Sequence, residues 1–129
     1  MSERIEQQKV VNASAADVYA ALTQSAVFRE MTGPPAEISD DEGGQFSLFG
    51  GFITGRNIEL VPDVRMVQAW RSESWDDGVY SIVSFSFEET DGKTLVKLVH
   101  AGFPAGQKPH LEEGWQKNYW SKLAEKFNA

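Results

Sequence analysis

The segment LEEGWQKNYWSKLAEKF, residues 111–127, decides which fold this sequence can adopt. Large apolar side chains recur there at every fourth position: Leu111, Trp115, Tyr119, Leu123 and Phe127. This spacing places them on one face of a helix, while the charged residues take the other faces. The sequence therefore predicts a long C-terminal helix with a ring-rich face that has to be buried.

The chain before this helix alternates with a period of two, which is typical of half-buried strands. Two Asp-Gly pairs, Asp77-Gly78 and Asp91-Gly92, are suited to hairpin turns. Short connections between such runs indicate antiparallel pairing, because a parallel crossover needs a much longer segment. We predict strands near residues 36–39, 45–49, 52–61, 64–72, 79–88 and 93–101.

The N-terminal part alternates over residues 4–12 and then changes period. Ser14, with Asp17 three residues later, resembles a capping box and predicts the start of a helix. A second short helix is expected from Ser25 to about Met31, because the prolines that follow stop it.

A sheet of this length must cover its apolar face, and the C-terminal helix is the element large enough to do so. The expected class is therefore α+β: a curved antiparallel sheet of about six or seven strands wrapped around a long C-terminal helix, with two short helices after the first strand. A length of 129 residues suits one domain over residues 1–129.

Composition restricts the classes of function. The chain has no Cys, which excludes disulfides and thiolate metal sites. Its net charge of −7 and the lack of a basic stripe argue against binding nucleic acid. The N-terminus is polar and no apolar run approaches the roughly 20 residues that cross a bilayer. We expect no membrane span and a cytoplasmic location.

Four segments together resemble a known family. They are residues 50–62 (GGFITGRNIELVP), 65–71 (RMVQAWR), 99–104 (VHAGFP) and 113–120 (EGWQKNYW). In this order and spacing they are similar to the domain shared by homologues of the activator of the heat-shock protein 90 ATPase. That family belongs to the START-like, helix-grip superfamily, and the resemblance extends over nearly the whole chain.

The resemblance implies the helix-grip fold, with a cavity between the sheet and the long helix. Superfamily members bind lipids, hormones and polyketides, and some are enzymes. The family itself implies a chaperone-linked, co-chaperone-like role.

Strand alternation predicts which side chains face that cavity. On residues 52–60 the inward set is Phe52, Thr54, Arg56, Ile58 and Leu60, with Asn57 and Glu59 facing solvent. One bulge would move a whole strand to the other face. The expected ligand-binding residues are Arg56, Ile58, Gln68, Trp70, Ser81, Val83, Phe85, Leu98, His100, Trp115, Tyr119 and Leu123.

The polar residues of this set leave alternatives open. An inward Arg56 needs an anion, because an unpaired buried charge is costly. It would bind a ligand carboxylate, pair with an acid such as Glu37 or Glu73, or extend outward from a strand end. His100 is a candidate acid/base, or else a satisfied structural residue. Trp75, at a hairpin tip, would contact a partner if it is exposed.

No constellation in the sequence assigns a chemistry. His100 and His110 lack a third ligand at regular spacing, so we expect no metal, and we expect no cofactor. The main hypothesis is a domain that binds a small hydrophobic or amphipathic ligand, either neutral or anionic. The alternatives are a domain that binds a chaperone, and a cyclase- or hydrolase-like enzyme that uses His100 with Arg56 or Tyr119. The sequence does not determine the oligomeric state.

Overall fold

The structure is a computed structural model that describes residues 3–127. Its elements follow the predicted order of one strand, two helices, six strands and a C-terminal helical segment. In chain order they are β1 (Arg4–Val11), α1 (Ala15–Thr23), α2 (Ser25–Thr32), β2 (Glu37–Ile38), β3 (Gln45–Leu48), η1 (Phe49–Gly51), β4 (Ile53–Val61), β5 (Arg65–Ser72), β6 (Ser81–Thr90), β7 (Lys93–Ala101), α3 (Lys108–Trp115), η2 (Gln116–Trp120) and α4 (Ser121–Phe127).

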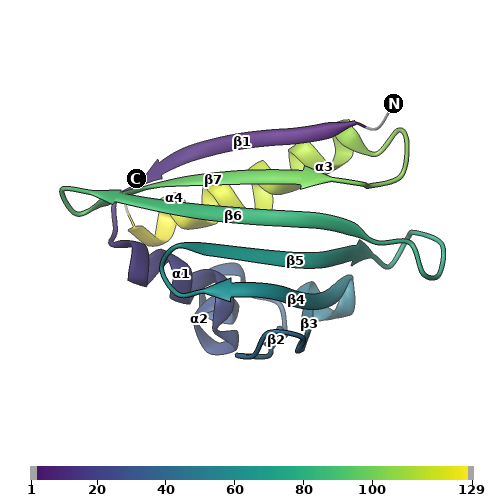
Figure 1. The fold of residues 1–129 in the computed structure, drawn as a ribbon, viewed down its shortest axis with the longest axis horizontal. Coiled ribbons are helices and arrows are strands. Elements are labelled where there is room, and N and C mark those ends of the chain that lie inside the picture. Colours follow the sequence, from purple (N-terminus) through teal and green to yellow (C-terminus); the bar gives the residue numbers. More distant parts are fainter. Residues whose placement is uncertain (1–2, 128–129) are drawn as a thin grey trace.

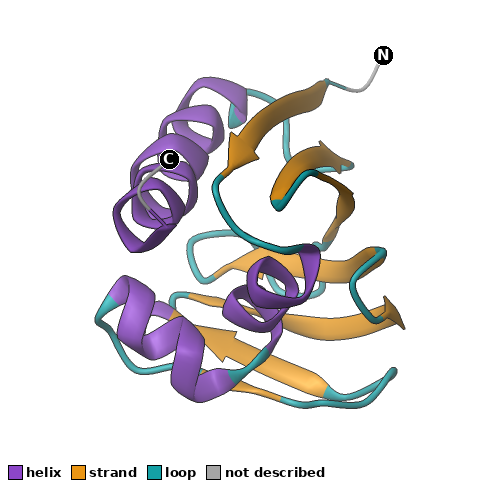
Figure 2. Cartoon of the chain, turned by 90° about the vertical axis from the view of Figure 1, so that its left-hand side faces the viewer, coloured by secondary structure: helices purple, strands orange, loops and turns teal. Residues whose placement is uncertain are grey.

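The strands form one seven-stranded antiparallel sheet in the order β1-β7-β6-β5-β4-β3-β2. The helices lie behind this sheet in Figure 1, and Figure 2 shows them gathered on one side of it. The C-terminal segment α3-η2-α4 runs behind β1, β7 and β6, while α1 and α2 lie lower in this view, behind β5 and β4. The core fills the space between the two layers. The predicted α+β helix-grip architecture is confirmed.

Two local signals in the sequence act as expected. The Ser14 hydroxyl accepts a hydrogen bond from the Asp17 N–H at 3.1 Å and so caps α1. The β6–β7 hairpin turns at Asp91 and Gly92, whose φ angles are 53° and 79°. A type I′ turn needs positive φ at both positions, which Asp-Gly tolerates.

The C-terminal helix differs from the uniform helix that the four-residue spacing predicts. A π-helical turn, η2, interrupts it, and the Ser121 N–H donates to the carbonyl oxygen of Gln116, five residues earlier. The wider turn lets the neighbours Tyr119 and Trp120 both face the sheet, with exposed fractions of 5% and 4%. Such turns recur at functional sites.

Strand β4 departs from simple alternation. Its pairing with β5 passes from Asn57–Gln68 directly to Glu59–Val67, so Ile58 is an extra residue in a bulge. Asn57 is consequently buried, whereas Arg56 and Ile58 are exposed on the outer face. The predictions that Arg56 and Ile58 face the cavity and that Asn57 faces solvent are therefore wrong.

The buried Asn57 has a structural task. Its Nδ2 donates to the carbonyl oxygens of Ser39, at 2.8 Å, and Asp41, at 3.4 Å. Its Oδ1 accepts a hydrogen bond from Gln68 Nε2 at 3.3 Å. These bonds satisfy the buried amide and hold the loop between β2 and β3 against the sheet.

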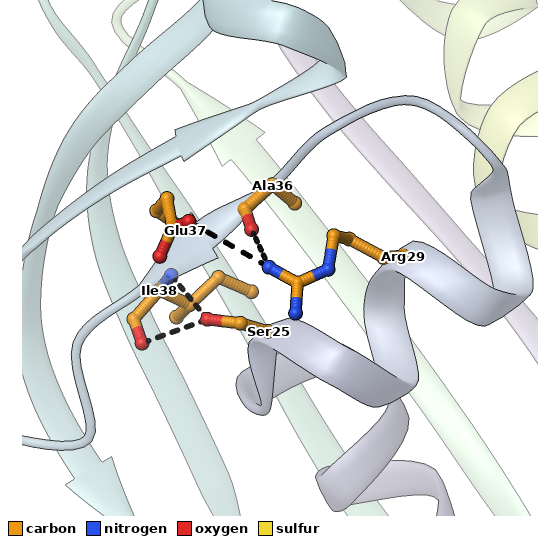
Figure 3. A network of polar contacts seen from close by, with 5 residues as sticks. All are labelled: Ser25, Arg29, Ala36, Glu37 and Ile38. Carbon is orange, nitrogen blue, oxygen red and sulfur yellow. Dashed lines mark hydrogen bonds and ion pairs between the residues drawn. The ribbon is translucent and has the colours of Figure 1, made fainter.

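The edge strand β2 is fastened to α2 by side chains (Figure 3). The Ser25 hydroxyl accepts from the Ile38 N–H at 2.7 Å, and Arg29 Nη1 donates to the Ala36 carbonyl oxygen at 2.8 Å. Arg29 Nη1 also lies 3.7 Å from Glu37 Oε1. Glu37, one of the two acids proposed above as a partner of Arg56, is therefore paired with a different arginine.

On β5, β6 and β7 the side chains predicted to face inward are buried. This set comprises Gln68, Trp70, Ser81, Val83, Phe85, Leu98 and His100. Trp75 is also buried, at 7% exposed, and its ring packs on Trp70 with centroids 5.8 Å apart. The exposure on which a partner contact at Trp75 depended is therefore not found.

Candidate functional site

A cleft of about 330 Å³ lies between the C-terminal helical segment and the chain around η1. Its walls are predominantly apolar, and it reaches the surface beside Phe52, which is 43% exposed, and His110, which is also exposed. The lining residues are Phe49, Phe52, Ile53, Trp70, His110, Leu111, Gly114, Trp115, Asn118 and Tyr119. A concave apolar site with few polar groups is typical of small-molecule binding.

One wall is a tight turn made by Phe49, Gly50 and Gly51, all with positive φ (54°, 70° and 96°). The Gly50 N–H donates to the Pro35 carbonyl oxygen at 2.9 Å, which anchors the turn. The turn places Phe49 edge-on to Phe28, at 5.7 Å between ring centroids. Glycine tolerates this conformation without the steric cost that other residues meet.

The opposite wall is one face of the helix at α3 and η2. Leu111, Gly114, Trp115 and Asn118 follow the i, i+3, i+4, i+7 spacing of a helical face. Gly114 lacks a side chain, and a Cβ there would meet only Asn118 Nδ2, at 4.0 Å. The missing side chain helps to keep this part of the cleft open.

The floor is a group of packed rings. Trp115 lies 4.5 Å from Tyr119 and 5.5 Å from Trp70, measured between centroids. Burial raises the pKa of the Tyr119 phenol strongly, an effect that the nearby Trp70 indole N–H opposes. The phenol therefore stays neutral at physiological pH and contributes a hydroxyl, not a charge.

Beneath the rings, His100 lies in a buried chain of hydrogen bonds. Trp115 Nε1 donates to His100 Nδ1 at 3.1 Å, and His100 Nε2 lies 2.7 Å from Ser81 Oγ. Because an indole can only donate, Nδ1 must accept and Nε2 must carry the proton. Ser81 Oγ then accepts from Nε2 and donates to the Trp70 carbonyl oxygen at 2.9 Å.

This chain suits a positioning residue better than a catalytic one. Burial lowers the pKa of His100 to about 4, and the side chain has no exposed surface. Both ring nitrogens are engaged, so neither is free to exchange a proton with a substrate. The exposed Arg56 lies on the opposite face of the sheet, so the structure does not bring His100 and Arg56 together.

The structure separates the predicted binding residues into three groups. Trp70, Trp115 and Tyr119 line the cleft, whereas Arg56 and Ile58 lie on the outer face of the sheet. The others are buried without lining the cleft: Gln68, Ser81, Val83, Phe85, Leu98, His100 and Leu123. No Lys, Arg, Asp or Glu of residues 3–127 lines the cleft, so it offers a ligand carboxylate no guanidinium or ammonium group, and the imidazole of His110 is the basic side chain in the lining.

Sequence reasoning missed several lining residues as binding candidates. Leu111, Gly114 and Asn118 share a helical face with Trp115, so helical spacing could have found them. Phe49 and Ile53 depend on the turn at Gly50-Gly51, for which strand alternation contains no signal.

No three His, Asp or Glu side chains within residues 3–127 are grouped so that they could hold a metal ion. Over the same residues, every helix is too short or too polar to cross a membrane.

Comparison with known proteins identifies the family to which the chain is similar. Residues 12–128 match the protein family described as "Activator of Hsp90 ATPase homolog 1-like protein". The activator of 90 kDa heat shock protein ATPase homolog of Dictyostelium discoideum is 36% identical over 114 residues, covering 87% of this chain and 30% of that protein. The human homolog 1 is 28% identical, with 86% and 33% covered. The chain thus spans about a third of the length of the curated relatives it matches.

Solved structures agree with this match. The crystal structure of an HSP90 activator from Plasmodium falciparum superposes with a TM-score of 0.92 at 25% identity, covering 97% of this chain and 96% of that one. The solution structure of the Aha1 dimer from Colwellia psychrerythraea gives a TM-score of 0.80 at 17% identity, covering 95% and 94%, and shows the shared fold.

Proposed function

Since the chain belongs to the family of activator of Hsp90 ATPase homolog 1-like proteins, we propose that it binds a 90 kDa heat-shock chaperone and stimulates its ATPase. The observation that carries this proposal is the 36% identity to the Dictyostelium activator over 87% of the chain. The match to the Plasmodium activator over nearly the full length of both chains supports it. We also propose that residues 1–129 form a single domain and that the protein is located in the cytoplasm. Cell fractionation tests the location.

An ATPase assay with the purified 90 kDa chaperone of the same organism tests the main proposal. Adding the chain in increasing excess should raise ATP turnover to a plateau, since stimulation by binding saturates. A chaperone-specific ATPase inhibitor should abolish the signal, which excludes a contaminating ATPase. No stimulation and no binding at high excess would contradict the proposal.

A second candidate function rests on the cleft, namely binding of a small apolar or amphipathic molecule. The aromatic walls contribute apolar contact area, and the Tyr119 hydroxyl and the Asn118 amide are polar groups in the lining. Because Arg56 lies outside and no Lys or Arg among residues 3–127 lines the cleft, a neutral ligand fits better than a carboxylate.

Intrinsic tryptophan fluorescence tests this candidate, because Trp70 and Trp115 line the cleft. Indole and a long-chain alcohol should change the emission at lower concentration than indole-3-acetate and the matching fatty acid. Gly114→Leu, which fills the cleft, should abolish the change, while Gln116→Leu, at an exposed helical position outside the lining, is the control. Native mass spectrometry of gently purified protein would identify a copurified ligand. Equal or absent binding by wild type and Gly114→Leu would remove this candidate.

A further inference from the structure

The indole N–H groups of the four tryptophans fall into two pairs. Those of Trp115 and Trp120 donate to side-chain acceptors, at 3.1 Å and 2.6 Å. Those of Trp70 and Trp75 are buried and have no hydrogen-bond partner among residues 3–127. A buried donor without an acceptor lowers stability, so each such group calls for an explanation.

The two unpaired indoles differ in where they lie. Trp70 lines the cleft, whereas Trp75 lies in the β5–β6 loop, outside the lining. The ring of Trp70 is held by its neighbours, with centroids 4.9 Å from His100 and 5.5 Å from Trp115. An indole packed in this way cannot turn its N–H towards another acceptor, so the direction of this donor is fixed before any ligand enters.

The Trp70 N–H lies beside the hydroxyl of Tyr119, which also lines the cleft. It favours the ionised phenol and so opposes the strong rise in the pKa of Tyr119 that burial causes. In the structure this contact falls short of a hydrogen bond. Because an indole N–H can only donate, Tyr119 Oη is the acceptor whenever the two groups pair, and the hydroxyl hydrogen of Tyr119 must then point away from Trp70.

The rings packed around Tyr119 offer that hydrogen no acceptor. The phenol ring lies 5.9 Å from Phe28, 6.0 Å from Phe49 and 6.1 Å from Phe85, measured between centroids. Phenylalanine side chains carry no acceptor atom. Burial keeps the hydroxyl protonated at physiological pH, because it raises the pKa of the phenol, so the group stays a donor. An acceptor for this donor can therefore come from a molecule in the cleft.

We propose that the cleft selects a neutral molecule with a ketone or ester carbonyl, whose oxygen accepts a hydrogen bond from the Tyr119 hydroxyl. Trp70 is a positioning residue, because its N–H donates to Tyr119 Oη and orients the hydroxyl towards the ligand. The apolar part of the molecule lies against the rings of Phe49 and Trp115. This inference rests on the second candidate function, binding of a small molecule in the cleft, and adds the chemical group that is recognised.

Other chemical classes fit this arrangement less well. A hydrocarbon leaves the Tyr119 hydroxyl and the Trp70 N–H without an acceptor, which is costly in an apolar site. A carboxylate is an acceptor, but it would leave water for a lining that has no Lys or Arg among residues 3–127. A group that can only donate, such as an ammonium, meets two donors.

Two probes of nearly the same shape test the inference: acetophenone, and α-methylstyrene, in which a methylene group replaces the carbonyl oxygen. Nitrogen–proton correlation NMR of the isotope-labelled full chain gives both dissociation constants from the indole N–H signals. Tyr119→Phe should weaken acetophenone binding about fivefold, through loss of one neutral hydrogen bond, and leave α-methylstyrene binding no weaker. Trp70→Phe should shift the ratio of the two constants in the same direction, by about twofold. Trp75→Phe is the matched control, because it removes the other unpaired indole N–H, outside the lining, and should leave the ratio unchanged.

The wild type supplies a second measurement that depends on no folded variant. Acetophenone should move the Trp70 indole proton signal downfield, because a carbonyl that accepts from Tyr119 strengthens the bond that Tyr119 itself accepts. α-Methylstyrene should not move it downfield. An equal response to both probes would overturn the inference.

The remaining outcomes separate the recognised group from the cleft itself. If the wild type binds both probes and Tyr119→Phe keeps the wild-type ratio, the hydroxyl does not recognise the oxygen, but the cleft still binds small molecules. If Asn118→Ala weakens acetophenone and Tyr119→Phe does not, the amide recognises the oxygen and the inference is overturned. If the wild type binds neither probe, the inference fails, and if indole and a long-chain alcohol do not bind either, the second candidate function fails with it.

Discussion

The two ends of the inner sheet face are filled differently. On β6 and β7, Val83, Phe85, Leu98 and His100 are each at most 1% exposed. The rings of Phe85 and His100 pack on Trp115 of the C-terminal helical segment. Beside η1 and the start of β4, rings surround a cleft of about 330 Å³, and Phe52 is 43% exposed. One sheet therefore carries a closed half and an open half.

The difference teaches which half stabilises the fold and which is available for binding. Close packing makes every atom of a buried side chain contribute to the free energy of unfolding. An open apolar cleft gives up part of that stabilisation and keeps surface for a ligand. Substitutions in the two halves should therefore differ in cost even where the residue type is the same.

The largest expected effect separates the halves directly. Phe85→Ala should lower the free energy of unfolding by about 3–5 kcal/mol, because the ring is buried among Trp115, Tyr119 and Trp120 and leaves a cavity. Phe52→Ala, at the mouth of the cleft, should cost less than about 1 kcal/mol. Urea denaturation monitored by circular dichroism measures both. Equal losses would mean that the two halves are packed alike.

The next effect concerns the polar chain in the closed half. The pKa of His100 is lowered by burial from 6.5 to about 4, so the unfolded chain binds a proton more readily than the folded one. Stability should therefore fall as pH drops from about 6.5 towards about 4, by about 3 kcal/mol, and level off below that pH with respect to this group. Urea unfolding at several pH values measures the slope.

Substitution isolates this contribution from the carboxylates that titrate in the same range. His100→Gln preserves an acceptor for Trp115 and a donor for Ser81 but does not titrate, so the slope between pH 6.5 and 5 should flatten. A wild-type slope that His100→Gln does not alter would show that His100 is not held neutral.

A smaller effect tests the bulge in the open half. Asn57→Ala should cost about 1–3 kcal/mol, because the buried Gln68 amide loses its acceptor and the carbonyl oxygens of Ser39 and Asp41 lose their donor. Ile58→Thr, one residue further on, should stay within about 0.5 kcal/mol, because Ile58 is 50% exposed. Thermal unfolding of both variants decides the matter. Simple alternation along β4 predicts the reverse order of the two losses in stability. A larger loss in Ile58→Thr than in Asn57→Ala would therefore contradict the bulge.

These residues also show how far sequence reasoning extends. The stripe from Leu111 to Phe127 predicted the C-terminal helix, although a π-helical turn interrupts it. The alternation of β5 to β7 predicted the buried side chains there, because nothing interrupts the period of these strands. On β4 the apolar Ile58 lies in a bulge, and the polar Asn57 is buried where a loop needs its amide. That need depends on a segment 16 to 18 residues away in the chain, so local periodicity contains no trace of it.

The candidate site was less predictable than the fold for a similar reason. The positions of Trp70, Trp115 and Tyr119 follow from periodicity. The cleft itself depends on two local features: the tight Phe49-Gly50-Gly51 turn, and the missing side chain at Gly114. The π-helical turn that buries both Tyr119 and Trp120 depends on packing against the sheet. Hollows arise from how elements meet, whereas alternation reports only which face is buried.

The smallest expected effect is a gain, and it tests that view of the cleft. Gly114→Ala should raise the free energy of unfolding by about 0.5–1 kcal/mol, because alanine favours a helix interior and its methyl group meets only Asn118 Nδ2, at 4.0 Å. Gly55→Ala is the contrast on β4, since a Cβ there would lie 1.9 Å from the Ala69 carbonyl oxygen and should destabilise the sheet. Differential scanning calorimetry measures both signs. A loss of stability in Gly114→Ala would mean that the helix packs against this wall, and that the hollow which distinguishes the open half is filled.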